Sequence, residues 1–150
     1  MQIQRIQTLF LLLAIACVAA FLFVPFGYWS VAEAHAGNIE LVDLVGKNYA
    51  SLILPSVVAL VLMVIAVFSF KKMPFQKLMV VLSALATVAA AGVVIYIMTR
   101  GYDGESPEFE VKAVWSGGGM LLIAALIAQI SAYRNITRDQ NLLRSYDRLR

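Results

Sequence analysis

Cysteine and histidine are almost absent from this sequence, which contains one of each, Cys17 and His35. A lone thiol cannot form an intrachain disulfide or a CxxC redox pair, so thiol chemistry that needs two cysteines in one chain is excluded. A lone imidazole cannot supply both ligands of a bis-histidine haem within one chain. We expect His35 to be a surface side chain rather than a metal ligand.

Charged residues are also scarce, at 14% of the chain, whereas 61% of the residues are hydrophobic and the mean hydropathy is +0.82. Soluble domains contain about 25% charged residues. Four apolar runs reach the roughly 20 residues that a helix needs to cross a bilayer core, and they lack the alternation of barrel strands. The runs, Ile6–Phe26, Tyr49–Phe70, Leu78–Thr99 and Ala113–Tyr133, predict an all-α, four-transmembrane-helix bundle that forms one domain over residues 1–150.

The four runs contain no Asp, Glu, Lys or Arg. Ionisable residues within a membrane mark ion pathways and proton relays, so a proton-coupled transporter is not expected. The sequence also offers no catalytic constellation and no metal or cofactor site, and we expect a protein that is not an enzyme. Gln129 is the one amide in the middle of a run, and we expect it to bridge two helices.

The charge distribution predicts the orientation. The N-terminus, the 71–77 connection and the tail from Arg134 carry nine basic and two acidic residues, a net +7, whereas the 27–48 and 100–112 loops carry three and seven, a net −4. The positive-inside rule then places both termini in the cytoplasm. Arg5 and the apolar run after it also fit a signal peptide, but the run continues through Val24, which favours a retained first helix. The expected location is the bacterial inner membrane, with Trp29 and Trp115 in an aromatic belt.

Small residues recur at packing intervals in the last two runs. Ser83, Thr87 and Ala91 are spaced by four residues, as are Ala124, Ala128 and Ala132. Such stripes let membrane helices approach closely, either within the bundle or between copies in a homo-oligomer. Gly118, the centre of a glycine triplet, indicates close packing or a flexible start of the helix or, alternatively, a hinge or a site where the backbone binds a ligand.

The first outer loop has two stretches of period-two alternation, 29–35 and 39–44, separated by a plausible turn at 36–38. This pattern favours a small extracytoplasmic β-hairpin, to which 109–112 could add a strand. An irregular acidic loop is the alternative.

The tail, residues 134–150, has apolar residues at helical spacing and several arginines, which predicts a short cytoplasmic amphipathic helix. We expect its arginines to contact anionic lipid headgroups or, alternatively, a cytoplasmic protein. The candidate contact residues at the two ends of the chain are Arg5, Arg138, Asp139, Leu143, Arg144, Asp147 and Arg148.

Both ends also resemble a known family. The start, IQRIQTLFLLLA at 3–14, and the close, ITRD at 136–139 with LRSYDRLR at 143–150, are similar to those of a Bacteroidetes membrane-protein family. That family is catalogued only as domain of unknown function 4293. The resemblance implies a four-span inner-membrane protein and carries no activity or site residues.

The leading functional hypothesis is a non-enzymatic scaffold or accessory subunit of a membrane complex, which contacts lipids and a protein partner and not nucleic acid. The alternative is a small oligomeric channel or carrier for a neutral or apolar solute. A lipid- or quinone-binding subunit, whose partner supplies the chemistry, is a third hypothesis.

Overall fold

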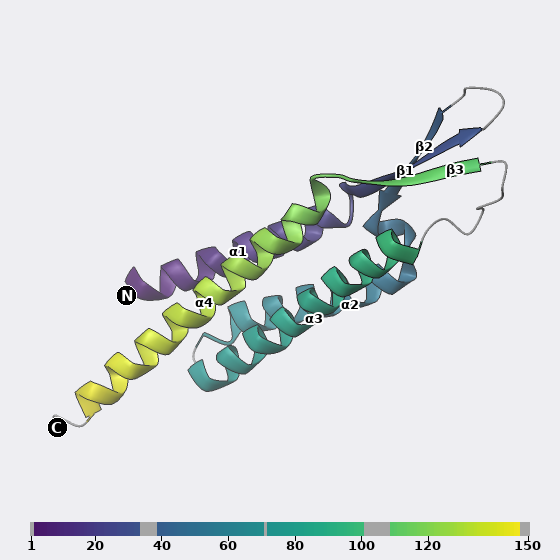
Figure 1. Ribbon diagram of the computed structural model, residues 1–150. Helices are drawn as coiled ribbons and strands as arrows, with labels where there is room; N and C mark the ends of the chain where they lie inside the picture. Colours follow the sequence, from purple (N-terminus) through teal and green to yellow (C-terminus); the bar gives the residue numbers. More distant parts are fainter. Residues whose placement is uncertain (1, 34–38, 71, 101–108, 148–150) are drawn as a thin grey trace.

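The computed structural model describes residues 2–33, 39–70, 72–100 and 109–147. It is an elongated bundle of helices with a small sheet at one end, and both chain termini lie at the other end (Figure 1). The elements in chain order are α1 (Gln2–Phe21), β1 (Pro25–Glu33), β2 (Ile39–Val45), a 3-10 turn η1 (Gly46–Asn48), α2 (Ala50–Phe68), α3 (Met73–Arg100), β3 (Phe109–Trp115) and α4 (Gly118–Asp147).

The four helices form a closed ring in which α1 packs on α2, α2 on α3, α3 on α4, and α4 back on α1. Each helix buries one narrow seam of residues, spaced mostly by three and four, and in α4 Ala128 beside the seam is buried as well. This spacing is close to the 3.5-residue period of left-handed helix packing, so one face of each helix stays inside along its length. The seams are Gln7, Leu11, Ala14, Val18 and Phe21 in α1; Leu52, Ser56, Ala59, Met63 and Ala66 in α2; Gln76, Val80, Ser83, Thr87, Ala90, Val94 and Met98 in α3; and Leu122, Ala125, Gln129, Ala132, Ile136 and Asp139 in α4.

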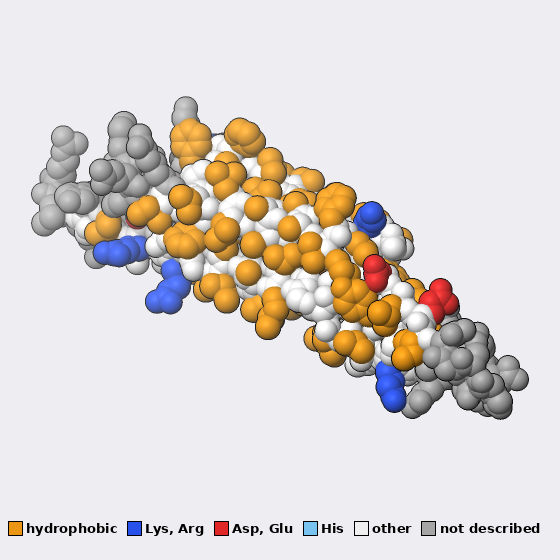
Figure 2. All heavy atoms as spheres, turned by 90° about the horizontal axis from the view of Figure 1, so that it is seen from above, with side chains coloured by type: hydrophobic (Ala, Val, Ile, Leu, Met, Phe, Trp, Pro, Cys, Tyr) orange, Lys and Arg blue, Asp and Glu red, His pale blue; other side chains and the backbone are white. Residues whose placement is uncertain are grey.

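Outside the seams the bundle is covered by apolar side chains. Figure 2 shows them across the middle of one face, with basic side chains at the terminal end and acidic ones among basic ones at the sheet end. Three helices, α2, α3 and α4 from Gly118 to Leu142, are long and apolar enough to cross a membrane. The apolar part of α1, Ile6–Phe21, is shorter. These properties indicate a membrane protein.

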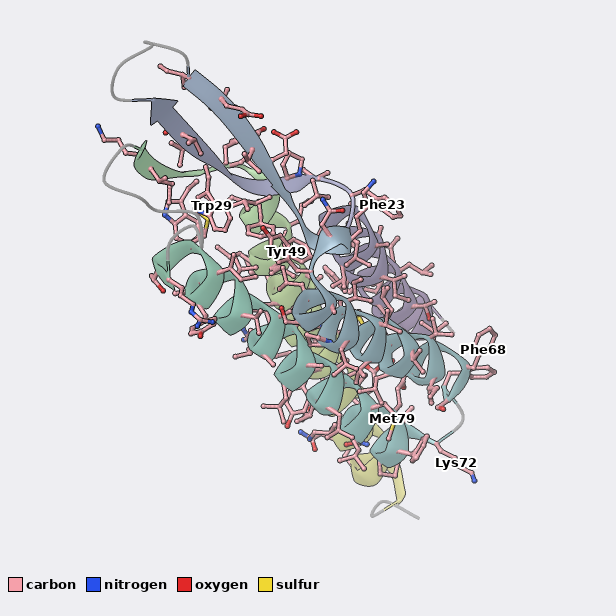
Figure 3. All side chains as sticks on the ribbon, turned by 90° about the vertical axis from the view of Figure 1, so that its right-hand side faces the viewer. Phe23, Trp29, Tyr49, Phe68, Lys72 and Met79 are labelled. Carbon is pink, nitrogen blue, oxygen red and sulfur yellow. The ribbon has the colours of Figure 1, made fainter. Side chains whose placement is uncertain are left out.

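The sheet has the strand order β2-β1-β3, and both pairings are antiparallel. Its inward face carries Trp29 and Leu44, which are buried against the ends of the helices together with Phe26 and Met98. Figure 3 shows Trp29 between the strands and the end of α3. Two backbone hydrogen bonds of 3.0 Å lie where the sheet meets the bundle: the N–H of Ser116, just before α4, donates to the Phe26 carbonyl in β1, and the N–H of Lys47 in η1 donates to the carbonyl of Leu22, just after α1. The predicted hairpin with an added strand is therefore confirmed as a three-stranded sheet, while the turn at 36–38 and His35 lie outside the described residues.

Three expectations about the elements are corrected. The first helix ends at Phe21 rather than at Phe26, because Pro25 begins β1. The last run does not start as helix at Ala113, since 109–115 form β3. The tail is not a separate short helix, because α4 runs unbroken for 30 residues to Asp147. Of the two tryptophans expected in an aromatic belt, Trp29 is only 9% exposed, whereas Trp115 is 58% exposed.

Candidate functional site

Polar side chains interrupt the apolar seams at two levels of the bundle and also at Ser56 of α2, whose buried hydroxyl has no hydrogen-bond partner among the described residues. The central level contains Ser83, Thr87 and Gln129, and the level at the terminal end contains Gln7 and Asp139, with Gln76 also buried there. Buried polar groups in a bilayer are costly unless they are hydrogen-bonded, so these levels are the natural candidates for a specialised role.

At the central level, Gln129 of α4 is completely buried. Its Nε2 donates to Thr87 Oγ1 of α3 at 3.0 Å and approaches Met63 Sδ of α2 at 3.2 Å, so one amide contacts two other helices. The Thr87 hydroxyl donates in turn to the Ser83 carbonyl at 2.9 Å. The amide oxygen Oε1 of Gln129 is buried and accepts no hydrogen bond from the described residues. The cluster of Ser83, Thr87 and Gln129 therefore has one unpaired hydrogen-bond acceptor, Gln129 Oε1, and contains no titratable side chain.

At the terminal end, Gln7 of α1 donates through Nε2 to a carboxylate oxygen of Asp139 in α4. Asp139 is only 7% exposed and Gln7 only 4%. A hydrogen bond to a charged acceptor is stronger than a neutral one, so this pair ties the start of the chain to the end of α4. Asp139 was predicted to contact a lipid or a protein partner from a separate tail helix, and not to be buried in the bundle. The signal that would have found it is the seam spacing of α4, which continues through Ile136 to residue 139.

The expected packing stripes lie partly inside the bundle. Ser83, Thr87 and Ala128 are buried and Ala91 is half-buried, but Ala124 is exposed. Ala125 takes the buried position instead, because a period near 3.5 residues cannot hold a strict interval of four on one face.

Gly118, the first residue of α4, lies against the start of β1. A Cβ built on it would stand 2.3 Å from the Pro25 carbonyl oxygen and 3.0 Å from Phe26 Cα. The same atom on Gly117 or Gly119 would meet nothing within 4 Å. Only the central glycine of the triplet is therefore required for a close backbone approach, and it holds α4 against the strand that follows α1.

Of the expected terminal contact residues, the structure describes the side chains of Arg138 and Asp139. Arg138 is exposed, while its neighbour Asp139 points into the bundle. The side chains of Arg5, Leu143, Arg144 and Asp147, and all of Arg148, lie outside the described part of the chain.

The outward face of the sheet, for which the sequence predicts no role, carries the apolar Ile39, Leu41 and Val114 together with Tyr28, Ser30 and the charged Asp43 and Lys112. The register aligns Ser30 with Leu41, and Tyr28 with Val114, so these side chains share one face. Leu41 is 64% exposed, Ile39 68% and Val114 48%. Beyond the ends of the helices, such apolar exposure is a feature of interaction surfaces.

The fold thus defines a helical protein of the membrane type with a small sheet at one end and a polar bundle interior. A family model described as "Domain of unknown function (DUF4293)" matches residues 3–149, and the chain belongs to that family. No curated protein matches the chain.

Proposed function

We propose that the protein is a non-enzymatic accessory subunit or scaffold of a membrane complex in the bacterial inner membrane, that α1 also spans the bilayer, and that both termini lie in the cytoplasm. The apolar part of α1, Ile6–Phe21, gives a length of about 24 Å, a few ångströms short of the hydrocarbon core, and local thinning of the bilayer accommodates such a mismatch. The termini share one end of the bundle with the α2–α3 turn and Lys72, the end with the positive charge (Figure 3).

The observation that carries this proposal is the outward face of the sheet. Under the proposed topology it lies outside the hydrocarbon core, where lipid does not cover apolar side chains. Ile39 and Leu41 are nonetheless more exposed than not. A protein partner would bury them, and the outer edges of β2 and β3 are placed to accept a further strand. The partner expected from this chemistry is the extracytoplasmic part of another membrane protein.

Site-directed photocrosslinking in native membranes tests the proposal. A benzophenone amino acid at Leu41 should give a discrete crosslinked protein band. Leu41→Asp should abolish co-purification of that protein without changing the level of this chain. The matched control is the same probe at Val61 of α2, which is 52% exposed on the apolar surface and should crosslink to lipid alone. Lipid adducts alone at both positions would refute the subunit role.

Labelling tests the topology. In a Cys17→Ala background, Glu40→Cys should react with an impermeant maleimide from the periplasmic side, whereas Lys72→Cys should react only after the membrane is opened. Both positions are exposed. The opposite pattern would overturn the orientation and leave the crosslinking result valid.

One observation favours a carrier of a small neutral solute as a second function. The unpartnered Gln129 Oε1 at the centre of the bundle could accept a hydrogen bond from a solute. Solute flux in liposomes should then fall in Gln129→Leu. Gly118→Leu is a poor probe, because its side chain would collide with the Pro25 backbone.

A further inference from the structure

An apolar groove of about 250 Å³ runs between α3 and α4 on the outer surface of the bundle. Its walls are Val81, Ala84 and Val88 of α3 and Ile130 and Tyr133 of α4, and Gln129 forms part of its base. The α3 residues lie at intervals of three and four, so they follow one stripe along the helix. An apolar, elongated groove on a membrane helix pair fits a hydrocarbon chain.

The groove ends at a cationic group. Tyr133 closes its terminal end, and Lys77 Nζ of α3 lies 4.6 Å from the centre of the Tyr133 ring. This cation–π contact holds the ammonium at the junction of apolar groove and polar surface. Beyond Tyr133, the same side of α4 continues as an open hollow that includes Arg134, Thr137 and Arg138. We call Lys77, Arg134 and Arg138 the basic shelf.

We propose that the groove and the basic shelf form a binding site for one anionic phospholipid, with an acyl chain between α3 and α4 and the headgroup phosphate on Lys77, Arg134 and Arg138. Basic pockets between membrane helices at the cytoplasmic side recognise acidic headgroups. Guanidinium groups suit phosphate oxygens through paired N–H donors. The site rests on the proposed membrane topology but not on the subunit role.

Charge decides between a lipid and a second copy of this chain as the occupant. Asp139, next to Arg138, turns into the bundle toward Gln7, so its carboxylate lies behind the shelf and does not occupy it, although it still interacts electrostatically with Arg138. A parallel second copy would bring its own positive end against the shelf, and like charges repel. The negative charge of an anionic headgroup is instead attracted to the same three cations.

The experiment titrates the full-length protein in dodecylmaltoside with dioleoyl phosphatidylglycerol or dioleoyl phosphatidylcholine and counts bound lipids by native mass spectrometry. Phosphatidylglycerol should bind more tightly, with a stoichiometry of one. Each basic residue near an anionic surface contributes about fivefold, so Lys77→Gln should weaken binding about fivefold and the triple shelf variant about a hundredfold. Phosphatidylcholine binding should change little.

Two matched controls sharpen the result. Arg100 lies 5.6 Å from the Tyr96 ring at the opposite end of α3, without the groove, and Arg100→Gln should bind phosphatidylglycerol as the wild type does. Ala84→Phe fills the groove and should abolish tight binding, whereas Val61→Phe on α2 should not. The proposal would be overturned if the wild type bound both lipids with equal affinity. It would also be overturned if Arg100→Gln weakened phosphatidylglycerol binding as much as Lys77→Gln does.

The remaining outcomes are also decisive. A dimer that Ala84→Phe dissociates would make the groove an interface between copies and overturn the lipid site. If Ala84→Phe fails to fold, the surface variants Arg134→Gln and Arg138→Gln, both at exposed positions, still decide the question. Leu41→Asp should retain lipid binding, so failure of the subunit role would leave this result intact.

Discussion

Replacing Gly118 with alanine tests the closest backbone contact between the bundle and the sheet. The added Cβ would stand 2.3 Å from the Pro25 carbonyl oxygen and 2.7 Å from its carbonyl carbon. Ordinary contact begins near 3.4 Å, so either α4 or the start of β1 would have to move by about 1 Å. Neither neighbour is a side chain that can rotate away.

The cost follows from what holds the two backbones together. Overpacking a rigid site costs about 1–3 kcal/mol, and the Ser116 N–H to Phe26 carbonyl bond of 3.0 Å fixes this one. We therefore expect Gly118→Ala to lower the free energy of unfolding by about 3 kcal/mol. Gly119→Ala adds the same atom in open space and gains helix propensity, so it should be neutral or stabilise by up to about 1 kcal/mol.

The assay is equilibrium unfolding in mixed dodecylmaltoside–dodecylsulfate micelles, followed by tryptophan fluorescence. The comparison of the two neighbouring variants cancels any general effect of alanine on α4. If the two free energies agree within about 0.5 kcal/mol, α4 does not approach β1 as closely as described, and the reasoning is refuted.

The other predictions concern the buried polar levels and the tryptophans. Asp139→Leu should cost about 2 kcal/mol, because it leaves the buried Gln7 amide without its acceptor, and Gln7→Leu/Asp139→Leu should recover most of that loss; additive losses in the double-mutant cycle would contradict the pair. Gln129→Leu should change stability by no more than about 1 kcal/mol, since an interhelical amide contributes little in lipid. Gln129→Ala should cost roughly 2 kcal/mol or more, because it leaves a cavity. A larger loss of stability in Gln129→Leu than in Gln129→Ala would contradict this explanation. Acrylamide should quench a protein that retains only Trp29 several-fold less than one that retains only Trp115, as their exposures of 9% and 58% require; equal quenching would place Trp29 at the surface.

Much of the fold could be predicted because it depends on local periodicity. Apolar runs of helical length predict α2 and α3, and the alternation of apolar and polar residues over 39–44 predicts β2. These patterns reflect the environment of each face of one element, which short stretches of sequence record directly. The boundaries were less accurate, because the end of β3, Ala113 to Trp115, is apolar and continues into α4 without a charged residue between them.

The polar interior could not be predicted in the same way. Asp139 is buried because Gln7, 132 residues earlier, faces it across the bundle, and no local pattern records that encounter. Gly118 poses the same difficulty, since its neighbours Gly117 and Gly119 look identical in sequence but meet nothing within 4 Å. Both features depend on how α1 and its following strand lie against α4.

These two contacts together explain how the axial position of α1 against α4 is fixed. Lipid gives little hydrophobic preference between alternative helix alignments, so specific close contacts must select one. Gly118 fits against the start of β1 at one end, and Gln7 meets Asp139 at the other. A slip of one turn, about 5.4 Å, would break both. Because β1 follows α1 and β3 leads into α4, the same slip would also shift the β1–β3 register. The polar pair at the positive end therefore helps to set the geometry of the sheet at the far end of the bundle.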